Sequence, residues 1–425
     1  MLETIKSIMW AIVTALILLS GLYFSKELHF PQLKINKIFK SLKGNNNKGI
    51  TPIKTLFLTL AGRIGVGSIA GVALAIYLGG PGTIFWMWVV AIISGALAYI
   101  ETMLAIKYKD KKQNIGGPSY YIKKGLKNKP LAIIYSLIII VSYLIGFIPI
   151  QSNTVAKSID MINPTNHLII GLIIAFISFV IIKGGINKIS KVTGKLVPFM
   201  TLIYISMALF VIIINIEKFP QVLSQIIKEA FQIKPFLTSF IPVILIGVQR
   251  AIFSNESGIG LGAIAASASN SINGSKSGYI QVLGVYITTI LICTATAFMI
   301  LIFDYKSVTL TNPNGIELTS LAFNHHFGSL GTILLVACIL MFSFSTVLTG
   351  YYYCQSSLKF LSKNINTKCL LIITPLSVVL GAITSPTTIW TLVDILVAIL
   401  AIINIYSIFK LKEEIMLYYK KYDRI

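Results

Sequence analysis

Apolar stretches of about 20 residues recur along the whole chain, and each is long enough to cross the hydrocarbon core of a bilayer. Hydrophobic residues make up 55% of the 425 positions and charged residues only 12%, which is roughly half the charge fraction of a soluble chain. A backbone inside lipid must satisfy its own hydrogen bonds, and an apolar run of this length does so as a helix. We therefore predict an all-α membrane protein that crosses the bilayer about eleven times.

The predicted spans share a membrane-length apolar run with few charges. They lie at 5–24, 54–78, 82–106, 131–151, 166–183, 193–215, 236–268, 277–303, 329–358, 367–384 and 388–411. No small-residue cleavage site follows the first run, so we interpret it as a span rather than a signal peptide. The amphipathic stretch 219–232 is expected to lie along the membrane interface.

Lysines concentrate in alternate connecting segments, namely 25–54, 107–129, 183–195 and the tail 412–425. By the positive-inside rule these segments face the cytoplasm. With eleven spans this puts the N-terminus outside and the C-terminus in the cytoplasm, and we expect a multi-pass protein of the plasma (inner) membrane. The net charge of +22 does not indicate nucleic acid, because the basic residues are spread among loops instead of forming one patch.

Two spans are interrupted at matching places. After the first span, the other ten divide into groups at 54–215 and 236–411, and the first member of each contains a glycine-rich break, at 62–68 and 253–260. Glycine and small polar residues lower the cost of leaving helical geometry, and freed backbone groups in a membrane must line a cavity. Matched breaks in halves of opposite orientation indicate an inverted-repeat transporter. The alternative is that the glycines only permit close helix packing.

This pattern divides the chain into five segments. They are an extra N-terminal span with a basic cytoplasmic loop (1–53), a first five-helix repeat (54–215), an interfacial connection (216–235), a second five-helix repeat (236–411) and a cytoplasmic tail (412–425).

Five ionisable residues fall in or near the spans: Arg63, Glu101, Arg250, Glu256 and Asp394. Such residues are costly in a membrane and usually pair or serve transport. Glu256 lies inside the second break and either acts in transport or bonds the backbone groups that the break frees; a pair with Arg250 is one option. Glu101 is expected to snorkel to the inner interface. The depth of Asp394 suits a gate or a cation ligand.

Sequence motifs of hydrolases, metalloproteases and phosphate-binding loops do not occur, so we do not expect an enzyme or a bound cofactor. The expected partners are a small-molecule substrate and the lipid bilayer. The sequence does not indicate nucleic acid or an obligatory protein partner.

The same residues carry a family resemblance. Its motifs include Gly79-Gly80-Pro81-Gly82 followed by Trp86-Met87-Trp88, Gln151-Ser152-Asn153, and Arg250 with Phe253-Ser254-Asn255-Glu256. Over about 10–410 the chain resembles the alanine-or-glycine:cation symporters (sodium:alanine symporters) of the amino acid-polyamine-organocation superfamily. The resemblance implies a leucine-transporter-type fold, a five-plus-five inverted repeat, with one extra N-terminal helix. It also implies sodium-driven import of alanine or glycine.

The resemblance further implies a substrate site and an ion site. The implied substrate-binding residues are Gly65, Val66, Gly67, Ser68, Gln151, Asn255 and Trp390, and the implied sodium-site residues are Ile64, Ser345 and Thr346. The substrate carboxylate is expected to meet backbone N–H groups of the first break.

The first break departs from the family's usual G-T-G-N, because this chain reads Gly65-Val66-Gly67-Ser68 and carries Arg63 at a position that is neutral in the family. A guanidinium stays protonated in proteins, so we hypothesise that Arg63 stands in for the sodium ion. The alternatives to a sodium symporter are then an ion-independent exchanger or facilitator, or a non-transporting membrane sensor. Arg63 could also face a cytoplasmic vestibule and attract the substrate carboxylate.

Overall fold

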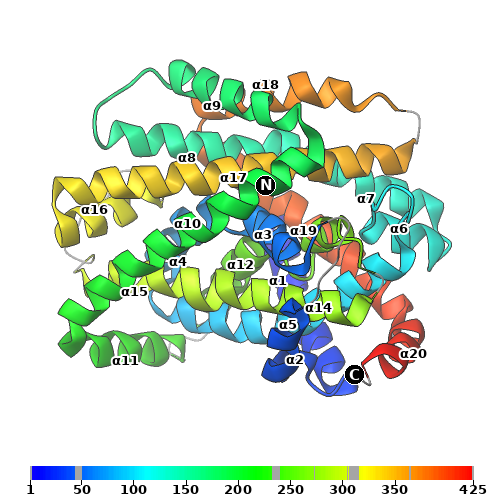
Figure 1. Cartoon of the computed structure of the whole chain (residues 1–425). Helices are drawn as coiled ribbons and strands as arrows, with labels where there is room; N and C mark the ends of the chain where they lie inside the picture. Colours follow the sequence, from blue (N-terminus) through cyan, green and yellow to red (C-terminus); the bar gives the residue numbers. More distant parts are fainter. Residues whose placement is uncertain are drawn as a thin grey trace.

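The computed structural model is a bundle of long helices (Figure 1). It describes residues 2–43, 50–231, 240–271, 273–303, 305, 315–362 and 365–423. Within these ranges the only strand-like pairing is an isolated bridge between Asp110 and Ile115. The all-α prediction is confirmed.

Helices occupy the place of every predicted span. In the described residues, seven helical stretches are long and apolar enough to cross a membrane: Thr4–Glu27, Gly82–Tyr108, Lys129–Asp160, Gly185–Ile214, Gly274–Ile302, Ser329–Leu361 and Pro386–Lys410. Three shorter apolar helices, His167–Ile182, Ile241–Asn255 and Thr367–Ile383, lie where further spans were predicted. The remaining span is a bent pair of helices.

This bent pair forms the first break. Helix α3 (Pro52–Arg63) and the stretch Val66–Gly79, which contains helix α4 (Ala70–Gly79), meet at 69°. Thr51 caps the start of α3 by accepting a hydrogen bond from the Lys54 amide, which satisfies one of the free N–H groups of a first turn. Helix α3 ends at Arg63, because Ile64 and Gly65 leave helical dihedral angles.

The second break separates helix α12 (Ile241–Asn255) from helix α13 (Leu261–Ser267). Three of its residues have positive φ: Glu256 at 55°, Gly258 at 84° and Gly260 at 71°. Glycine adopts these angles without steric cost, whereas a side chain there costs about 1–2 kcal/mol. The glycines therefore explain how the chain leaves the helix. Glu256 is the one non-glycine residue of this break with a left-handed backbone.

The two broken spans lie at the centre of the bundle. Helix α5 (Gly82–Tyr108) packs against α12, α13 and α14 (Gly274–Val285), and helix α17 (Ser329–Leu361) packs against α3. Helices α8 (Ile148–Asp160), α9 (His167–Ile182) and α18 (Leu370–Ile383) form an outer layer beside α17 (Figure 1). The outer faces of α9 and α18 stay apolar, with Phe176 69% and Ile372 72% exposed, as helices that face lipid require.

The extra first helix, α1 (Leu2–Glu27), belongs to the bundle. It packs against α5 and against α19 (Pro386–Lys410), and its Trp10 is buried. The side chain of Ile17 lies next to Gly258, since a Cβ on that glycine would come within 2.2 Å of the Ile17 Cδ1 atom. The extra span thus reaches the second break.

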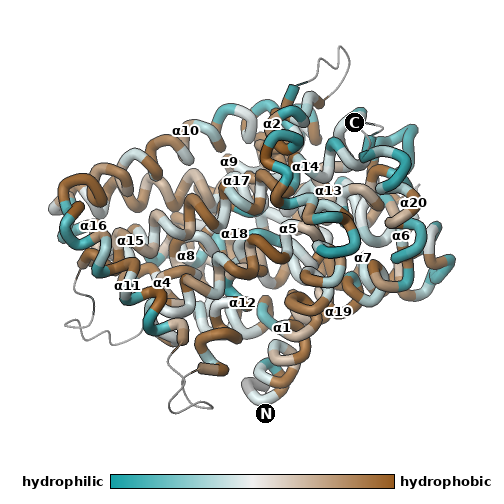
Figure 2. The backbone as a smooth tube through the Cα atoms, turned by 90° about the horizontal axis from the view of Figure 1, so that it is seen from below, coloured by the Kyte–Doolittle hydropathy of each residue, from teal (hydrophilic) through white to brown (hydrophobic). Residues whose placement is uncertain are grey.

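Segments predicted to share one side of the membrane lie together. Helix α2 (Ile35–Leu42), helix α6 (Pro118–Lys124) and the tail helix α20 (Lys412–Tyr422) carry the most hydrophilic backbone regions of the bundle (Figure 2). Lys107 pairs with Glu414 at 2.6 Å, and the Lys276 Nζ donates to the Lys43 carbonyl at 2.5 Å. These contacts show that the segments lie at the same end of the bundle. That this end faces the cytoplasm stays a prediction.

Helix α11 (Phe219–Ala230) occupies most of the stretch that was expected at the interface. Parts of four predicted segments lie outside the described residues. They are 1 and 44–49 of the N-terminal segment, 232–235 of the connection, 236–239, 272, 304, 306–314 and 363–364 of the second repeat, and 424–425 of the tail.

Candidate functional site

The first break is held by a glutamine from a neighbouring helix. The Gln151 Oε1 atom, on α8, accepts a hydrogen bond from the Val66 amide at 3.1 Å. A Cβ on Gly65 would lie 2.6 Å from the Thr346 Oγ1 atom and 3.0 Å from Gln151 Oε1. A side chain at 65 would therefore displace Thr346 and Gln151, and α8 and α17 both reach the backbone of the break.

The two breaks face each other. The hydroxyls of Ser68 and Ser254 lie 2.8 Å apart, and the Ser68 carbonyl accepts a hydrogen bond from Thr296 at 2.8 Å. A Cβ on Gly67 would meet the Phe253 ring at 2.6 Å. The structure thus brings Gly67 and Ser68 of the first break against Phe253 and Ser254 of the second, although the two breaks are far apart in the sequence.

Asn255 organises the second break from within. Its Oδ1 accepts from the Ser257 amide at 3.0 Å, and its Nδ2 donates to Thr289 at 3.2 Å on the π-helical segment η6 (Tyr286–Cys293). Both ends of the Asn255 amide are therefore engaged by the protein in this arrangement.

An aromatic layer lies over the two breaks. The Phe253 ring stacks on Phe147, with centroids 5.2 Å apart, and contacts Trp390 at 4.9 Å. The Arg250 guanidinium lies over Trp390 at 4.8 Å. The implied substrate residue Trp390 is thus separated from the Gly67 backbone by Phe253.

Arg250 pairs with Asp394 and not with Glu256. Its Nη2 atom lies 3.0 Å from the Asp394 Oδ2 atom, and both side chains are buried. The Trp10 indole N–H donates to the Asp394 carbonyl at 3.1 Å. The Arg250–Glu256 pair, which the sequence left as one option, does not form, because Arg250 on α12 faces α19 whereas Glu256 follows the end of α12 and turns to other helices.

The Glu256 carboxylate bonds two tyrosines. Its Oε1 accepts from the Tyr143 hydroxyl at 2.8 Å and its Oε2 from the Tyr353 hydroxyl at 3.4 Å. Tyr143 lies on the π-helical segment η3 (Ser142–Phe147) and Tyr353 on α17. The side chain therefore links three elements at the break, and its partners are hydroxyls instead of the freed backbone N–H groups.

Glu101 is buried, with 1% of its surface exposed. Its Oε1 accepts from the Gly260 amide at 3.1 Å and from the Asn404 Nδ2 at 2.6 Å. Asn404 also donates to the Gly258 carbonyl at 2.9 Å. The expected interfacial position of Glu101 is wrong, because the carboxylate is buried between Gly260, which precedes α13, and Asn404 on α19, where it supports the second break.

Arg63 is also buried, at 2% exposure. Its Nη1 donates to the Gln281 carbonyl at 3.0 Å, and a Cβ on Gly262 or Gly284 would lie within 2.4 Å and 2.6 Å of its guanidinium. The guanidinium therefore lies against α13 and α14, in space that two glycines leave open.

The implied ion-site residues present neutral oxygens. The Ser345 and Thr346 hydroxyls both donate to the Ala61 carbonyl, at 3.2 and 3.0 Å, and Thr346 also donates to the Phe342 carbonyl at 3.1 Å. Ile64 directly follows α3, and its N–H donates to the Leu60 carbonyl. Hydroxyl and carbonyl oxygens are the ligands that hard cations prefer, so these residues fit a sodium ion. Among the described residues no cluster of His, Cys, Asp and Glu suits another metal.

Sequence reasoning gave no role to Tyr143, Tyr353, Gln281 or Asn404, which bond the buried charges. A signal exists for three of them, since Tyr143, Tyr353 and Asn404 are polar side chains inside long apolar runs. Such groups usually face the bundle interior and bond one another. Gln281 bonds Arg63 through its main-chain carbonyl, which the side-chain pattern does not indicate.

The chain is similar in sequence to known amino-acid carriers. The model of the sodium:alanine symporter family matches residues 1–425. The amino-acid carrier protein AlsT of Bacillus subtilis is 36% identical over 424 residues, covering 98% of this chain and 90% of the relative. The probable sodium/glutamine symporter GlnT of the same organism is 36% identical over 433 residues, covering 99% and 89%.

Among solved structures, MhsT in complex with L-phenylalanine matches with a TM-score of 0.61 and 11% identity, covering 84% of this chain and 87% of that one. At this identity the match shows the fold alone. It agrees with the predicted leucine-transporter type of architecture.

Proposed function

The chain belongs to the sodium:alanine symporter family, and we propose that it imports a small neutral amino acid, alanine or glycine, across the plasma membrane. The observation that supports this best is the contact of the two breaks, where Ser68 meets Ser254 beside the Gln151–Val66 hydrogen bond. Backbone N–H and C=O groups that a break frees inside the membrane need a polar hydrogen-bond partner. A zwitterionic amino acid of the size of alanine is such a partner.

The proposed binding mode uses the backbone of the first break. The amide of Val66 is bonded by the Gln151 carbonyl oxygen, which a substrate carboxylate replaces. Ser68 contacts Ser254 where the two breaks meet, and Asn255 follows Ser254 in the chain. The Phe253 ring lies so close to the α-carbon of Gly67 that even a Cβ there would contact it. The small space between the two breaks favours a substrate with a very small side chain.

Sodium is the proposed coupling ion at Ser345, Thr346 and the Ala61 carbonyl. An ion bound there ties α3 to α17, so it stabilises the first break in the geometry that holds the substrate. Since a ligand shifts an equilibrium only by its difference in affinity for the two states, the broken helix is the element through which ion and substrate assist each other.

A second candidate is an ion-independent exchanger. The observation that favours it is Arg63, a permanent positive charge buried at the end of the same helix. In this alternative the guanidinium supplies the charge that the symporter takes from sodium.

Uptake by purified protein in proteoliposomes tests both candidates. Labelled L-alanine, D-alanine and glycine are compared with and without an inward sodium gradient, in wild type and Arg63→Thr. We expect sodium-stimulated uptake that Thr346→Ala abolishes. Uptake that ignores sodium in wild type and gains sodium dependence in Arg63→Thr supports the exchanger instead, and no saturable binding of any of the three supports a non-transporting protein.

A further inference from the structure

A basic pocket lies between the end of helix α5 and the tail helix α20. Its volume is about 400 Å³, within the roughly 300–1,000 Å³ of typical ligand sites. Its lining residues belong to neither of the two breaks, so the pocket is separate from the proposed transport site. The charged residues that line it are Lys107, Lys109, Lys111, Glu414 and Lys421.

The lysines of this pocket outnumber the carboxylates that balance them. Lys107 pairs with Glu414 at 2.6 Å, and Glu414 is the one acidic residue in the lining. Asp110 lies nearby in the loop after α5, but its Oδ1 atom accepts from backbone amides of that loop. Among the described residues, no ion pair involves the other three lysines of the lining, Lys109, Lys111 and Lys421. The pocket therefore carries three positive charges that no acidic side chain neutralises.

One of these cations is fixed in place. Lys109 is 6% exposed, and its Nζ atom donates to the Ser269 and Ser271 carbonyls at 2.7 and 2.9 Å. Burial, together with the nearby Lys111, lowers the pKa of Lys109 to about 8. An anion bound beside the two lysines offsets their repulsion and favours the charged form of Lys109.

The pocket lies where two spans end. Helices α5 and α19 are both long and apolar enough to cross the membrane, and Lys107 lies in the last turn of α5. Tyr418 and Tyr422 line the pocket with ring centroids 4.4 Å apart, and Leu417, also in the lining, is 69% exposed. Tyrosine is enriched at the level of lipid headgroups, and an exposed leucine at this level contacts acyl chains. The pocket thus lies at headgroup depth with an apolar residue at its edge.

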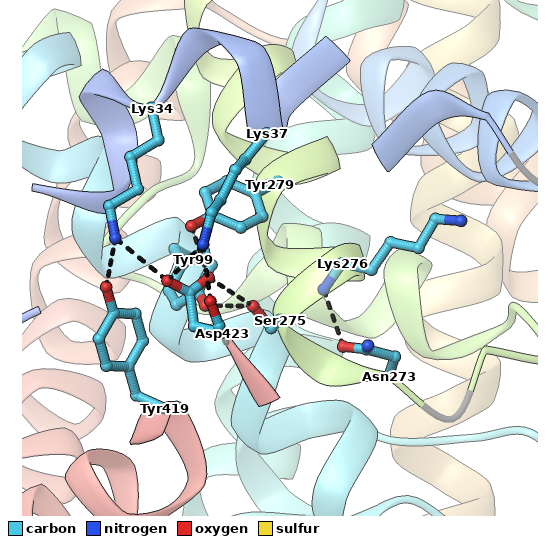
Figure 3. A network of polar contacts seen from close by, with 9 residues as sticks. All are labelled: Lys34, Lys37, Tyr99, Asn273, Ser275, Lys276, Tyr279, Tyr419 and Asp423. Carbon is cyan, nitrogen blue, oxygen red and sulfur yellow. Dashed lines mark hydrogen bonds and ion pairs between the residues drawn. The ribbon is translucent and has the colours of Figure 1, made fainter. Parts of the chain in front are cut away.

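The tail helix forms a fixed wall of this pocket. Asp423, which follows α20, accepts hydrogen bonds from Lys34, just before α2, and from Tyr279 on α14 (Figure 3). The Tyr418 hydroxyl accepts from the Gly274 amide at 3.1 Å. These bonds hold α20 against the bundle, so the shape of the pocket is part of the folded protein.

We propose that this pocket binds the phosphate group of an anionic phospholipid. Lysine ammonium groups bind phosphate oxygens as point charges, and basic pockets between membrane helices hold anionic headgroups. A phosphodiester with an uncharged alcohol fits the three unbalanced lysines, whereas the cation of a zwitterionic headgroup is repelled by them. A soluble phosphate ester has the same chemistry but lacks acyl chains, and the exposed Leu417 favours the lipid. The inference does not rest on the proposed function.

Native mass spectrometry of the full-length protein measures which lipid stays bound. The protein is delipidated in detergent and mixed with equal amounts of phosphatidylglycerol and phosphatidylcholine, and wild type should retain phosphatidylglycerol in preference. Lys111→Gln/Lys421→Gln should weaken the apparent affinity for phosphatidylglycerol about tenfold or more, because each lysine near the membrane surface contributes a factor of roughly five. The matched control is Lys112→Gln/Lys420→Gln. It removes two exposed lysines that are adjacent in the sequence and do not line the pocket, and it should bind as wild type does.

Two competitors identify the source of the phosphate. Excess inorganic phosphate or glycerophosphate should leave the bound phosphatidylglycerol in place, because neither has acyl chains. Displacement by either one assigns the pocket to a soluble phosphate ester and overturns the lipid. Equal retention of the two lipids by wild type, or equal losses in the pocket and control variants, also overturns the proposal.

Thermal unfolding checks that the variants keep their fold. Both glutamine variants should unfold at the temperature of wild type, because Lys111 and Lys421 are exposed. If the pocket variant unfolds early, wild type at low and high salt still decides the question, since salt screens a charge-held headgroup. The preference for phosphatidylglycerol should then fall as salt rises, and a preference that salt leaves unchanged contradicts binding by the lysines.

Discussion

Arg250 and Asp394 form a buried ion pair that joins the helix before the second break to the last long helix of the bundle. Their Nη2 and Oδ2 atoms lie 3.0 Å apart, 144 residues apart in the sequence. The guanidinium also covers Trp390, and Trp390 contacts Phe253. The pair thus lies at one end of a series of contacts, from Arg250 through Trp390 and Phe253, that reaches the first break at Gly67.

Loss of one partner of this pair should be strongly destabilising. Arg250→Leu or Asp394→Leu leaves an uncompensated buried charge, which typically costs about 3–5 kcal/mol. The double variant Arg250→Leu/Asp394→Leu should recover most of this loss, because both charges are gone. Thermal unfolding of the detergent-solubilised variants measures the cycle. Equal losses in the single and double variants contradict the pairing.

Gln151→Ala should impair transport more than it impairs folding. The substitution leaves the Val66 amide without its acceptor, and loss of a buried hydrogen bond costs about 1–3 kcal/mol. Because Gln151 also holds the backbone of the first break in place, its loss should let the proposed carboxylate donors lose their geometry, and we expect alanine uptake to fall about tenfold or more. The KM for alanine in proteoliposomes is the measurement, and an unchanged KM argues against this binding mode. Gln225→Ala on α11 is a control.

Gly65→Ala should abolish uptake, since the added methyl group would lie 2.6 Å from Thr346 Oγ1 and 3.0 Å from Gln151 Oε1. Overpacking of this kind commonly costs about 1–3 kcal/mol. Gly194→Ala is a matched control, because that glycine is helical and a Cβ there meets nothing within 4 Å. It should leave uptake and thermal stability at or above wild type, given the better helix propensity of alanine. A functional Gly65→Ala protein contradicts the tight contact.

The tail should stay docked until the pH is strongly acidic. Asp423 accepts hydrogen bonds from Lys34, Lys37, Ser275 and Tyr279 (Figure 3). Burial acts to raise the pKa of Asp423, but the hydrogen bonds from Tyr279, Lys37 and Lys34 outweigh it and hold the pKa below its ordinary value. A lowered folded pKa means that the stabilisation is complete above the ordinary value, about 3.9, and is lost as the pH falls through the lowered one.

A spin label at Leu417→Cys, which is 69% exposed on the tail helix, reports this docking when the exposed Cys369 is replaced by serine. Its mobility should stay low from neutral pH to about pH 4 and rise below it. In Asp423→Asn the label should be mobile throughout. A label that is equally mobile in both proteins at neutral pH contradicts the docking.

The sequence by itself determined the helical membrane fold, the places of the spans and both breaks. Each depends on a local property, namely apolar length for the spans and glycine with small polar residues for the breaks, so no distant contact is needed to predict it. The lysine pattern likewise predicted that the segments 25–54 and 107–129 share one end of the bundle with the tail, and the contacts of Lys34 and Lys107 confirm this.

The partners of the buried charges were decided only by the tertiary structure. Sequence proximity suggested Arg250 with Glu256, whereas helix packing pairs Arg250 with Asp394 and Glu256 with Tyr143 and Tyr353. Position near a span end suggested that Glu101 snorkels, but the neighbouring helices enclose it beside Asn404. Pairing depends on which faces of distant helices meet, and a one-dimensional pattern of polar and apolar residues does not specify that.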